Sequence, residues 1–470
     1  MRLAHPVVRF ALMMFVAGQF AGSAAARSLI QQENAKEGAT DWVLTNPAKN
    51  REIEGYASLT SVNRGDALSL YVNTSAPLYE IDLFRLGWYG GKGARRMAAA
   101  IRRPGVSQPR PFVDASTHLV ECRWIKPYVL SIPKTPPTEW ISGMYLVKLT
   151  TVPSGRQAYI SFVVREDARR SALLFQSSVA TYQAYNTWGG WSLYTNPRAF
   201  KVSFDRPFLG LGAPPVFEGA WEYSMLRFLE REGYDVTYCT DLDTHEQGKS
   251  LLLHKAFIVV GHDEYWSWEM RNNVEAARDH GVNLGFFSAD DAYWQVRFEK
   301  SVSSGAPDRV MVCYKDKNLD PQFHSGKPYL TTVAFRNSLI NRPEAQLIGV
   351  MADHGHGEDT DIVIQEPSSW IFANTRLKKG DRLKGLLGYE NDRIYDSSPY
   401  GVQDLAHSPF KVNGKVIYSD MTVYTAASGS LVVATGSMQW CWGLDAYPRR
   451  NRLSRAAQQA TRNILHKFGA

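Results

Sequence analysis

The periodicity of the apolar residues changes abruptly at the stretch REDARR, Arg165–Arg170. Between about Trp42 and Arg165, short runs such as ALSLYVNT and AYISFVVRE alternate apolar and polar residues, and Gly, Pro, Asn and Asp separate the runs. Alternation with a period of two is typical of antiparallel strands, and several such strands at regular spacing favour a β-sandwich. We therefore expect a β-sandwich over residues 27–165.

Beyond this stretch, apolar runs alternate with helical patterns. ALLFQSS, AFIVVG and NLGFFSA are typical of buried strands, and helices are indicated by FEGAWEYSMLRFLEREG and by the residues from Ser267 to His280. Such an order predicts an open, mostly parallel sheet with helices on both faces over residues 166–470. This three-layer arrangement resembles the class I glutamine-amidotransferase-like fold. Less regular structure is expected beyond Phe298, followed by a closing helix from about Ser454 to Phe468.

The N-terminus has the pattern of a secretory signal. Two arginines precede an apolar run, and three alanines ending at Ala26 provide an A-x-A cleavage site. We expect residues 1–26 to be removed and the mature protein to be periplasmic or secreted. No later run reaches the ~18 apolar residues of a membrane helix. Oxidising compartments permit disulfides, and three pairings are open to Cys122, Cys239, Cys313 and Cys441.

Charge gives little support for a nucleic-acid partner. The formal charge of +7 is spread thinly, and its densest cluster, from Arg449 to Arg455, is typical of a solvated helix start. The 13 tryptophans fit either core packing or a crevice for flat or sugar-like ligands.

The stretch FIVVGHDEYWSWEMRN places polar side chains directly after a buried strand. In parallel sheets, ligands bind beyond the carboxyl ends of the strands, where loops and helix N-termini converge. We therefore expect one pocket to be lined by residues that follow several strands: Tyr182, Tyr185, His262, Tyr265, Asp290 and Trp440. The candidate catalytic residues are His262, Asp263, Glu264, Tyr185 and Asp290.

Other interpretations of these residues remain open. Asp263 or Glu264 could cap the helix that begins near Ser267. A cysteine nucleophile is excluded because FFSADD has none, and Ser288 lacks the flanks of a nucleophile elbow. Asp241 and Asp243 fit loop capping better than a carboxylate pair. The glycines of DHGHGED, residues 353–359, favour a loop over a metal site.

Several long motifs carry a family resemblance. TYQAYNTWGGWSLY, GHDEYWSWEMRN, ADDAYWQVRFE, LLGYENDR and GSMQWCWGLD resemble the large (β) subunit of N,N-dimethylformamidase and its relatives. FRLGWYGG and SGMYLVKL resemble the Ig-like domain found in many of those relatives.

The resemblance implies a mononuclear iron held by two tyrosines and one glutamate. A phenol of ordinary pKa ≈ 10 ionises only beside a hard, highly charged ion, so such ligands suit iron. Tyr265 matches one ligand, Tyr223 lies nearest the second, and Glu390 and Glu264 are substitutes for an unmatched glutamate. The predicted function is iron-dependent hydrolysis of an amide C–N bond in a small-molecule or polymer substrate, with no small subunit implied. The alternative is an exported glycan- or polymer-binding protein without catalysis.

Overall fold

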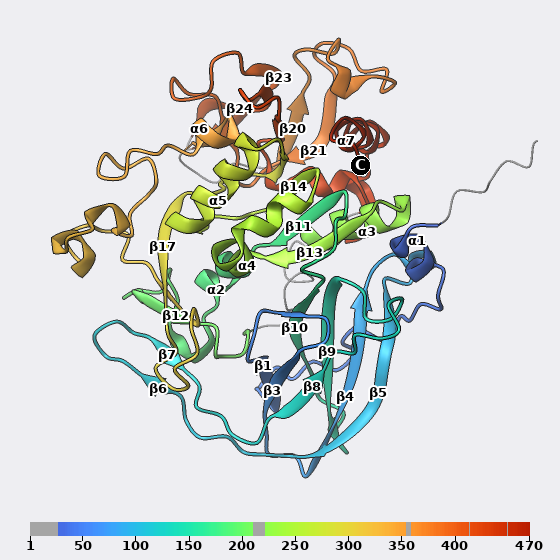
Figure 1. The fold of residues 1–470 in the computed structure, drawn as a ribbon, viewed down its shortest axis with the longest axis vertical. Coiled ribbons are helices and arrows are strands. Elements are labelled where there is room, and N and C mark those ends of the chain that lie inside the picture. The colour runs from blue at the N-terminus through green and yellow to red at the C-terminus, as the bar shows by residue number, and fades with distance from the viewer. Residues whose placement is uncertain (1–26, 210–220, 354–358, 413, 449) are drawn as a thin grey trace, which may run out of the picture.

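The structure is a computed structural model that describes residues 27–209, 221–353, 359–412, 414–448 and 450–470 (Figure 1). The predicted signal segment and residues 354–358 of the DHGHGED stretch therefore lie outside the described residues. All four cysteines lie within the described ranges, and each is a buried, free thiol.

The N-terminal part, residues 27–165, contains two sheets that share one core. Apolar side chains such as Leu70 and Val72 from one sheet meet Ile81 and Val147 from the other. The first sheet has the order β1 (Ile53–Ala57), β3 (Ala67–Thr74), β8 (Tyr128–Ser131). The second has the order β2 (Ser61–Asn63), β10 (Gln157–Arg165), β9 (Gly143–Val152), β4 (Leu78–Leu86), β5 (Ala94–Pro104). A ribbon of β6 (Phe112–Val113) and β7 (Val120–Glu121) extends from these sheets toward β12 (Lys201–Ser203) (Figure 1).

The predicted fold class is wrong. The described strands are distributed over seven sheets, most strand pairs are antiparallel, and the helices are short, so the chain is rich in β-structure. The expected three-layer, mostly parallel sheet of the glutamine-amidotransferase type is not what these residues form. The largest sheet is mixed, and smaller sheets lie beside it.

The seven-stranded sheet combines parallel and antiparallel strands. Its order is β13 (Val236–Thr240), β11 (Leu173–Ser177), β14 (Ala256–Gly261), β16 (Asn283–Ser288), β25 (Leu431–Ala434), β24 (Lys415–Thr425), β23 (Gln403–Val412). The first five strands pair in parallel, including β14 with β16 as the sequence indicated. The last two are antiparallel, because β23 ends at Val412 and β24 begins only three positions later, at Lys415.

Three smaller sheets complete the strands of the second part. A four-stranded sheet has the order β12 (Lys201–Ser203), β18 (Val310–Val312), β17 (Trp294–Glu299), β15 (Tyr265–Ser267). Two ribbons pair β19 (Met351–Ala352) with β22 (Asp392–Arg393), and β20 (Thr360–Val363) with β21 (Arg382–Leu387).

Two helices cover opposite faces of the parallel strands. Phe257 and Val259 of β14 pack toward α5 (Trp268–Asp279), whereas Ile258 packs toward α3 (Trp221–Glu232), because successive side chains of a strand point to opposite faces. The α-helices are α1 (Leu29–Asn34), α2 (Val179–Tyr185), α3 (Trp221–Glu232), α4 (Asp241–Glu246), α5 (Trp268–Asp279), α6 (Ala345–Ile348) and α7 (Arg455–Lys467). The 3-10 helices are η1 (Tyr89–Gly91), η2 (Trp188–Gly190), η3 (Gly248–Leu253), η4 (Pro321–His324), η5 (Pro328–Leu330), η6 (Trp370–Phe372), η7 (Met438–Gly443) and η8 (Arg450–Arg452).

The helices α5 and α7 agree with the sequence prediction to within a few residues at each end. Within the described ranges, none of the helices has both the length and the apolar character needed to cross a bilayer.

Candidate active site

The strand β14 ends in a sharp turn that leads into the predicted site. Gly261 has a φ of 78°, and a Cβ atom at this position would lie only 2.7 Å from Cβ of Trp221. Glycine alone tolerates this backbone at such close approach. The turn directs the chain through His262 toward the short strand β15.

The helix that follows is capped by a serine. Ser267 accepts a hydrogen bond from the amide of Met270 at 3.0 Å, which satisfies a free N–H of the first turn of α5. Asp263 instead accepts a hydrogen bond from Nε2 of Gln176 at 2.6 Å. Because Ser267 supplies the cap, the carboxylate of Glu264 is available for the site.

His262 lies among three buried carboxylates. Its Nε2 is 3.1 Å from an oxygen of Glu390 and 3.5 Å from one oxygen each of Glu264 and Asp290. Burial disfavours the imidazolium, but the nearby carboxylates of Glu390 and Asp290 raise the pKa of His262 well above its ordinary value. Burial, aided by the charge of Glu390, raises the pKa of Asp290 to about 7. At neutral pH, His262 therefore carries a charge and Asp290 can exchange a proton.

Two phenols bind the same carboxylate. The hydroxyl of Tyr185 donates to Oε2 of Glu264 at 2.8 Å, and that of Tyr194 lies 2.7 Å from Oε1 and 2.9 Å from Oε2. The two rings are stacked, with centroids 4.2 Å apart. Burial and the negative charge of Glu264 raise the pKa of both phenols far above the ordinary value. Both tyrosines are therefore neutral donors to Glu264 unless a cation is bound between them.

A buried lysine lies beside the phenols. Nζ of Lys315 donates to the hydroxyl of Tyr265 at 2.7 Å, and this hydroxyl donates to that of Tyr194 at 2.6 Å. The ammonium also lies 3.8 Å from the ring centroid of Tyr194 and 4.8 Å from that of Trp294. Burial lowers the pKa of Lys315. The lysine can thus donate a hydrogen bond or a proton at the rim of the cluster.

An open pocket gives access to this cluster. Its wall combines carboxylates, aromatic rings and one ammonium group. The lining residues are Tyr185, Tyr194, Glu264, Asp290, Tyr293, Trp294, Lys315, Ala352, Asp353, Tyr389, Glu390 and Asn391. A ligand in the pocket can therefore reach both Glu264 and Asp290.

The expected pocket lining is only partly observed. Tyr185 and Asp290 line the pocket, whereas His262 and Tyr265 lie behind it, in contact with lining residues. Tyr182 and Trp440 are not among the lining residues. The indole of Trp440 donates to Thr461 of α7 at 3.0 Å, so this ring belongs to the core.

Tyr223, expected as an iron ligand, lies elsewhere. Its hydroxyl donates to the carbonyl of Gly93 at 2.7 Å, and its ring packs edge-on against Trp42 at a centroid distance of 5.5 Å. The helical pattern of the sequence indicated no apolar partner for the face of α3 that carries Tyr223. In the structure, the N-terminal part covers this face. Tyr223 therefore does not join Tyr265 and Glu390 in a ligand set.

Sequence reasoning missed Tyr194 and Lys315. Tyr194 closes the motif TYQAYNTWGGWSLY, so its position in that motif was an available signal. Lys315 follows β18 in an ordinary polar stretch, CYKDKN, and nothing in that pattern marks it.

The described residues contain two groups of potential metal ligands. In each group, one ligand atom per residue lies within 4.8 Å of the others. The first is His262, Glu264 and Asp290, all buried, and the second is Asp404, His407 and Asp420 on β23 and β24. Only the first group adjoins the pocket.

Buried acids, a histidine and clustered phenols beneath an open pocket form a candidate functional site that packing alone does not require. The chain belongs to the N,N-dimethylformamidase beta subunit-like, C-terminal family, whose model matches residues 80–454.

Two curated relatives carry the name N,N-dimethylformamidase beta subunit. The protein from Paracoccus aminophilus is 25% identical over 320 residues, which cover 57% of this chain and 40% of the relative. The protein from Alcaligenes sp is 23% identical over 320 residues, with the same shares. The match thus spans less than half the length of either relative.

A solved structure of Pseudomonas fluorescens alkylpurine DNA glycosylase AlkC, bound to DNA containing an abasic site analog, aligns with 24% of this chain and 30% of its own. The sequence identity is 12% and the TM-score is 0.15, too low to indicate a common fold.

Proposed function

We propose that this chain is a hydrolase that cleaves the C–N bond of an amide in the pocket above Glu264. The observation that carries the proposal is the pair of phenols on the Glu264 carboxylate, beside His262 and next to Asp290 with its pKa of about 7. The family match supports the reaction class, since its curated relatives are named as amidases.

We further propose iron as the cofactor, held by Tyr185, Tyr194 and Glu264. These residues form a set of two tyrosines and one glutamate whose oxygens already contact one another. Hard oxygen donors suit a ferric ion, and a bound cation would offset the excess of buried negative charge. When bound, the ion would polarise a carbonyl group and lower the pKa of a bound water.

Asp290 is suited to act as the general base. It lines the pocket, and a pKa of about 7 lets it take a proton from water at neutral pH. As the water oxygen bonds to the carbonyl carbon, Asp290 accepts the water proton. It then returns this proton to the leaving nitrogen as the C–N bond breaks.

His262 and Lys315 support this proton transfer in different ways. His262 lies behind the pocket, and its positive charge holds the carboxylates of Asp290 and Glu390 in place. Lys315 lines the pocket, so its ammonium can donate a hydrogen bond to the carbonyl oxygen as negative charge develops there.

We propose a small amide as the substrate, bound against the rings of Tyr293, Trp294 and Tyr389. Export through the segment ending near Ala26 is part of the same proposal. It is tested by locating the protein in periplasmic, extracellular and cytoplasmic fractions.

Release of amine from a panel of simple amides, beginning with N,N-dimethylformamide, tests the function. We expect turnover by the iron-loaded protein and a loss of at least about 100-fold in Asp290→Asn, as for removal of a general base. Asp420→Asn, in the second group of potential metal ligands on β23 and β24, is the control and should keep full activity. Binding of glycans or polymers with no amine released from any amide would favour the binding-protein alternative and contradict the proposal.

A further inference from the structure

The loop between Tyr185 and Tyr194 is fixed from outside the pocket by a buried arginine. Arg206 is 1% exposed, and its acceptors among the described residues are all main-chain carbonyls. Nη1 donates to Trp188 at 3.1 Å and Trp191 at 2.8 Å, and Nη2 donates to Asn186 at 2.9 Å and Gln183 at 3.4 Å. One guanidinium therefore joins four carbonyls of the segment that carries both phenols.

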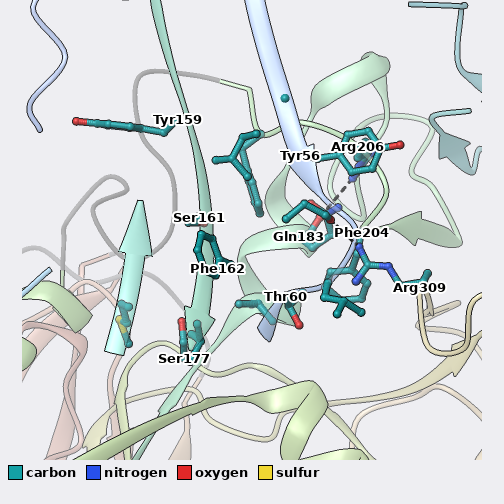
Figure 2. Close-up of a pocket in the computed structure, with 18 residues that line it drawn as sticks. Tyr56, Thr60, Tyr159, Ser161, Phe162, Ser177, Gln183, Phe204, Arg206 and Arg309 are labelled. Atoms are coloured by element: carbon teal, nitrogen blue, oxygen red, sulfur yellow. Dashed lines mark hydrogen bonds between the residues drawn. The ribbon is translucent and has the colours of Figure 1, made fainter. Parts of the chain in front are cut away.

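This arrangement is unusual for a buried charge. Burial without a carboxylate partner lowers the pKa of Arg206 to about 9. A guanidinium in such a position is costly unless its hydrogen bonds are satisfied, so the position of the loop and the position of Arg206 depend on each other. Figure 2 shows Arg206 at the edge of a cavity that Tyr56 also lines, with a dashed line to Gln183.

The N-terminal part holds the same loop through its tryptophan. Nε1 of Trp188, itself 1% exposed, donates to Oε2 of Glu54 on β1 at 2.8 Å. Arg51 forms two hydrogen bonds with Glu54 and lies 4.6 Å from the ring centroid of Trp188. These contacts fix the orientation of the indole ring as well as its buried position.

The ribbon of β6 and β7 closes the loop from another side. Gly189 has a φ of 81°, and a Cβ atom there would lie 2.6 Å from Cγ1 of Val120. Trp188 shares a small core with Val120, Cys122 and Trp124. The loop is thus enclosed by the N-terminal part and Arg206, while both of its ends point phenols at Glu264.

We propose that Arg206, Trp188 and Glu54 form a clamp that positions Tyr185 and Tyr194 around Glu264. These are positioning residues, because they act through the phenols and do not line the pocket above Glu264. The N-terminal part is then a component of the active site. The effect on ion binding rests on the proposed function, whereas the ordering of the loop does not.

Hydrogen exchange over residues 186–193, together with the affinity for ferric iron alone, tests the clamp in the full chain. Trp188→Phe keeps an aromatic ring at this position and removes the N–H donor. We expect about tenfold faster exchange and about tenfold weaker iron binding, in line with the loss of one buried hydrogen bond. Arg206→Lys should have a larger effect, since an ammonium cannot reach four carbonyls.

Glu54→Ala removes the acceptor of the indole and should behave like Trp188→Phe. Glu80→Ala is the matched control, because Glu80 of β4 accepts from Arg102 of β5 at 2.9 Å in a more exposed pair outside the clamp. Exchange in the loop and iron affinity should stay near the wild-type values in this control. Exchange in β23 and β24 should not change in any variant. Wild-type exchange and iron affinity in both Trp188→Phe and Arg206→Lys would overturn the clamp.

Failure of the proposed function has a different signature. If the wild-type protein binds no iron and cleaves no amide, the exchange data still decide the clamp. Faster exchange confined to the loop in Trp188→Phe and Arg206→Lys supports it, and unchanged exchange refutes it.

Discussion

Asp290 has the clearest acid–base role among the residues of the site. Its φ of 55° is unusual for a residue other than glycine, and its amide donates to Asp392 at 2.9 Å, which holds the carboxyl group toward His262. A strained backbone that neighbouring contacts maintain is a common feature of functional sites. The position of Asp290 is therefore set by the fold rather than by local preference.

The pH dependence of hydrolysis should report on Asp290. Burial raises its pKa to about 7, and a general base is active when deprotonated, so kcat/KM should rise as the pH increases through about 7 and then level off. Asp290→Asn should lose this rise of kcat/KM with pH, together with most of the hydrolysis rate. A wild-type profile that is flat from pH 6 to 8 would rule out this role.

Part of the site could be predicted from the sequence. His262, Glu264 and Asp290 follow strand ends, and that position alone places them together. Tyr194 is brought to Glu264 by a long irregular loop that no periodicity describes. Lys315 follows β18, which lies two strands from β15 in the four-stranded sheet, so only the pairing of strands far apart in sequence places it beside Tyr265.

At the scale of the elements, the N-cap of α5 links the stability of this helix to the geometry of the active site. Ser267 accepts from Met270 and also contacts Nδ1 of His245 at 2.7 Å, and it lies two residues after Tyr265. The comparable cap of α7, Ser454, accepts from Ala457 at 3.2 Å and does not adjoin the pocket. The two serines form a matched pair.

Ser267→Ala and Ser454→Ala should each lower the free energy of unfolding by about 1 kcal/mol, the usual cost of losing an N-cap. Only Ser267→Ala should also reduce kcat, because fraying of α5 moves the turn that carries Glu264. Denaturant unfolding and amide hydrolysis measured on the same preparations check both effects. Equal activity in the two variants would show that the cap has no influence on the site.

The elements show where sequence patterns succeed and fail. The β14 and β16 strands are short, apolar and separated by a helix, so their parallel pairing follows from the pattern. The β23 and β24 strands carry Ser, Asp and His among their apolar residues, and their hairpin was not anticipated. Pairing partners far apart in sequence, such as β16 with β25, are set by the whole fold and carry no local signal.

At the scale of the molecule, the two parts are joined by a fully buried ion pair. Arg85 of β4 and Glu230 of α3 are both 0% exposed, with Nη2 to Oε1 at 2.7 Å and Nη1 to Oε2 at 2.9 Å. Apolar residues of both parts, including Phe84 and Phe228, share the surrounding core. The N-terminal part and the second part are therefore expected to unfold together.

Arg85→Ala should destabilise the protein by about 3 to 5 kcal/mol, because it leaves the charge of Glu230 buried without its partner. Arg85→Met combined with Glu230→Leu should cost much less, since neither charge remains. Denaturant unfolding followed by tryptophan fluorescence measures both. A loss below about 1 kcal/mol in Arg85→Ala would mean that the interface is solvated.

The central claim is that Tyr185, Tyr194 and Glu264 hold a ferric ion at the active site. The visible absorption spectrum of the purified, iron-loaded protein tests it most directly, because phenolate bound to ferric iron gives a charge-transfer band. We expect about one iron per chain and a visible band. Glu264→Gln should lose both, and Asp420→Asn should keep both. A colourless protein, or a band that survives in Glu264→Gln, would contradict the account.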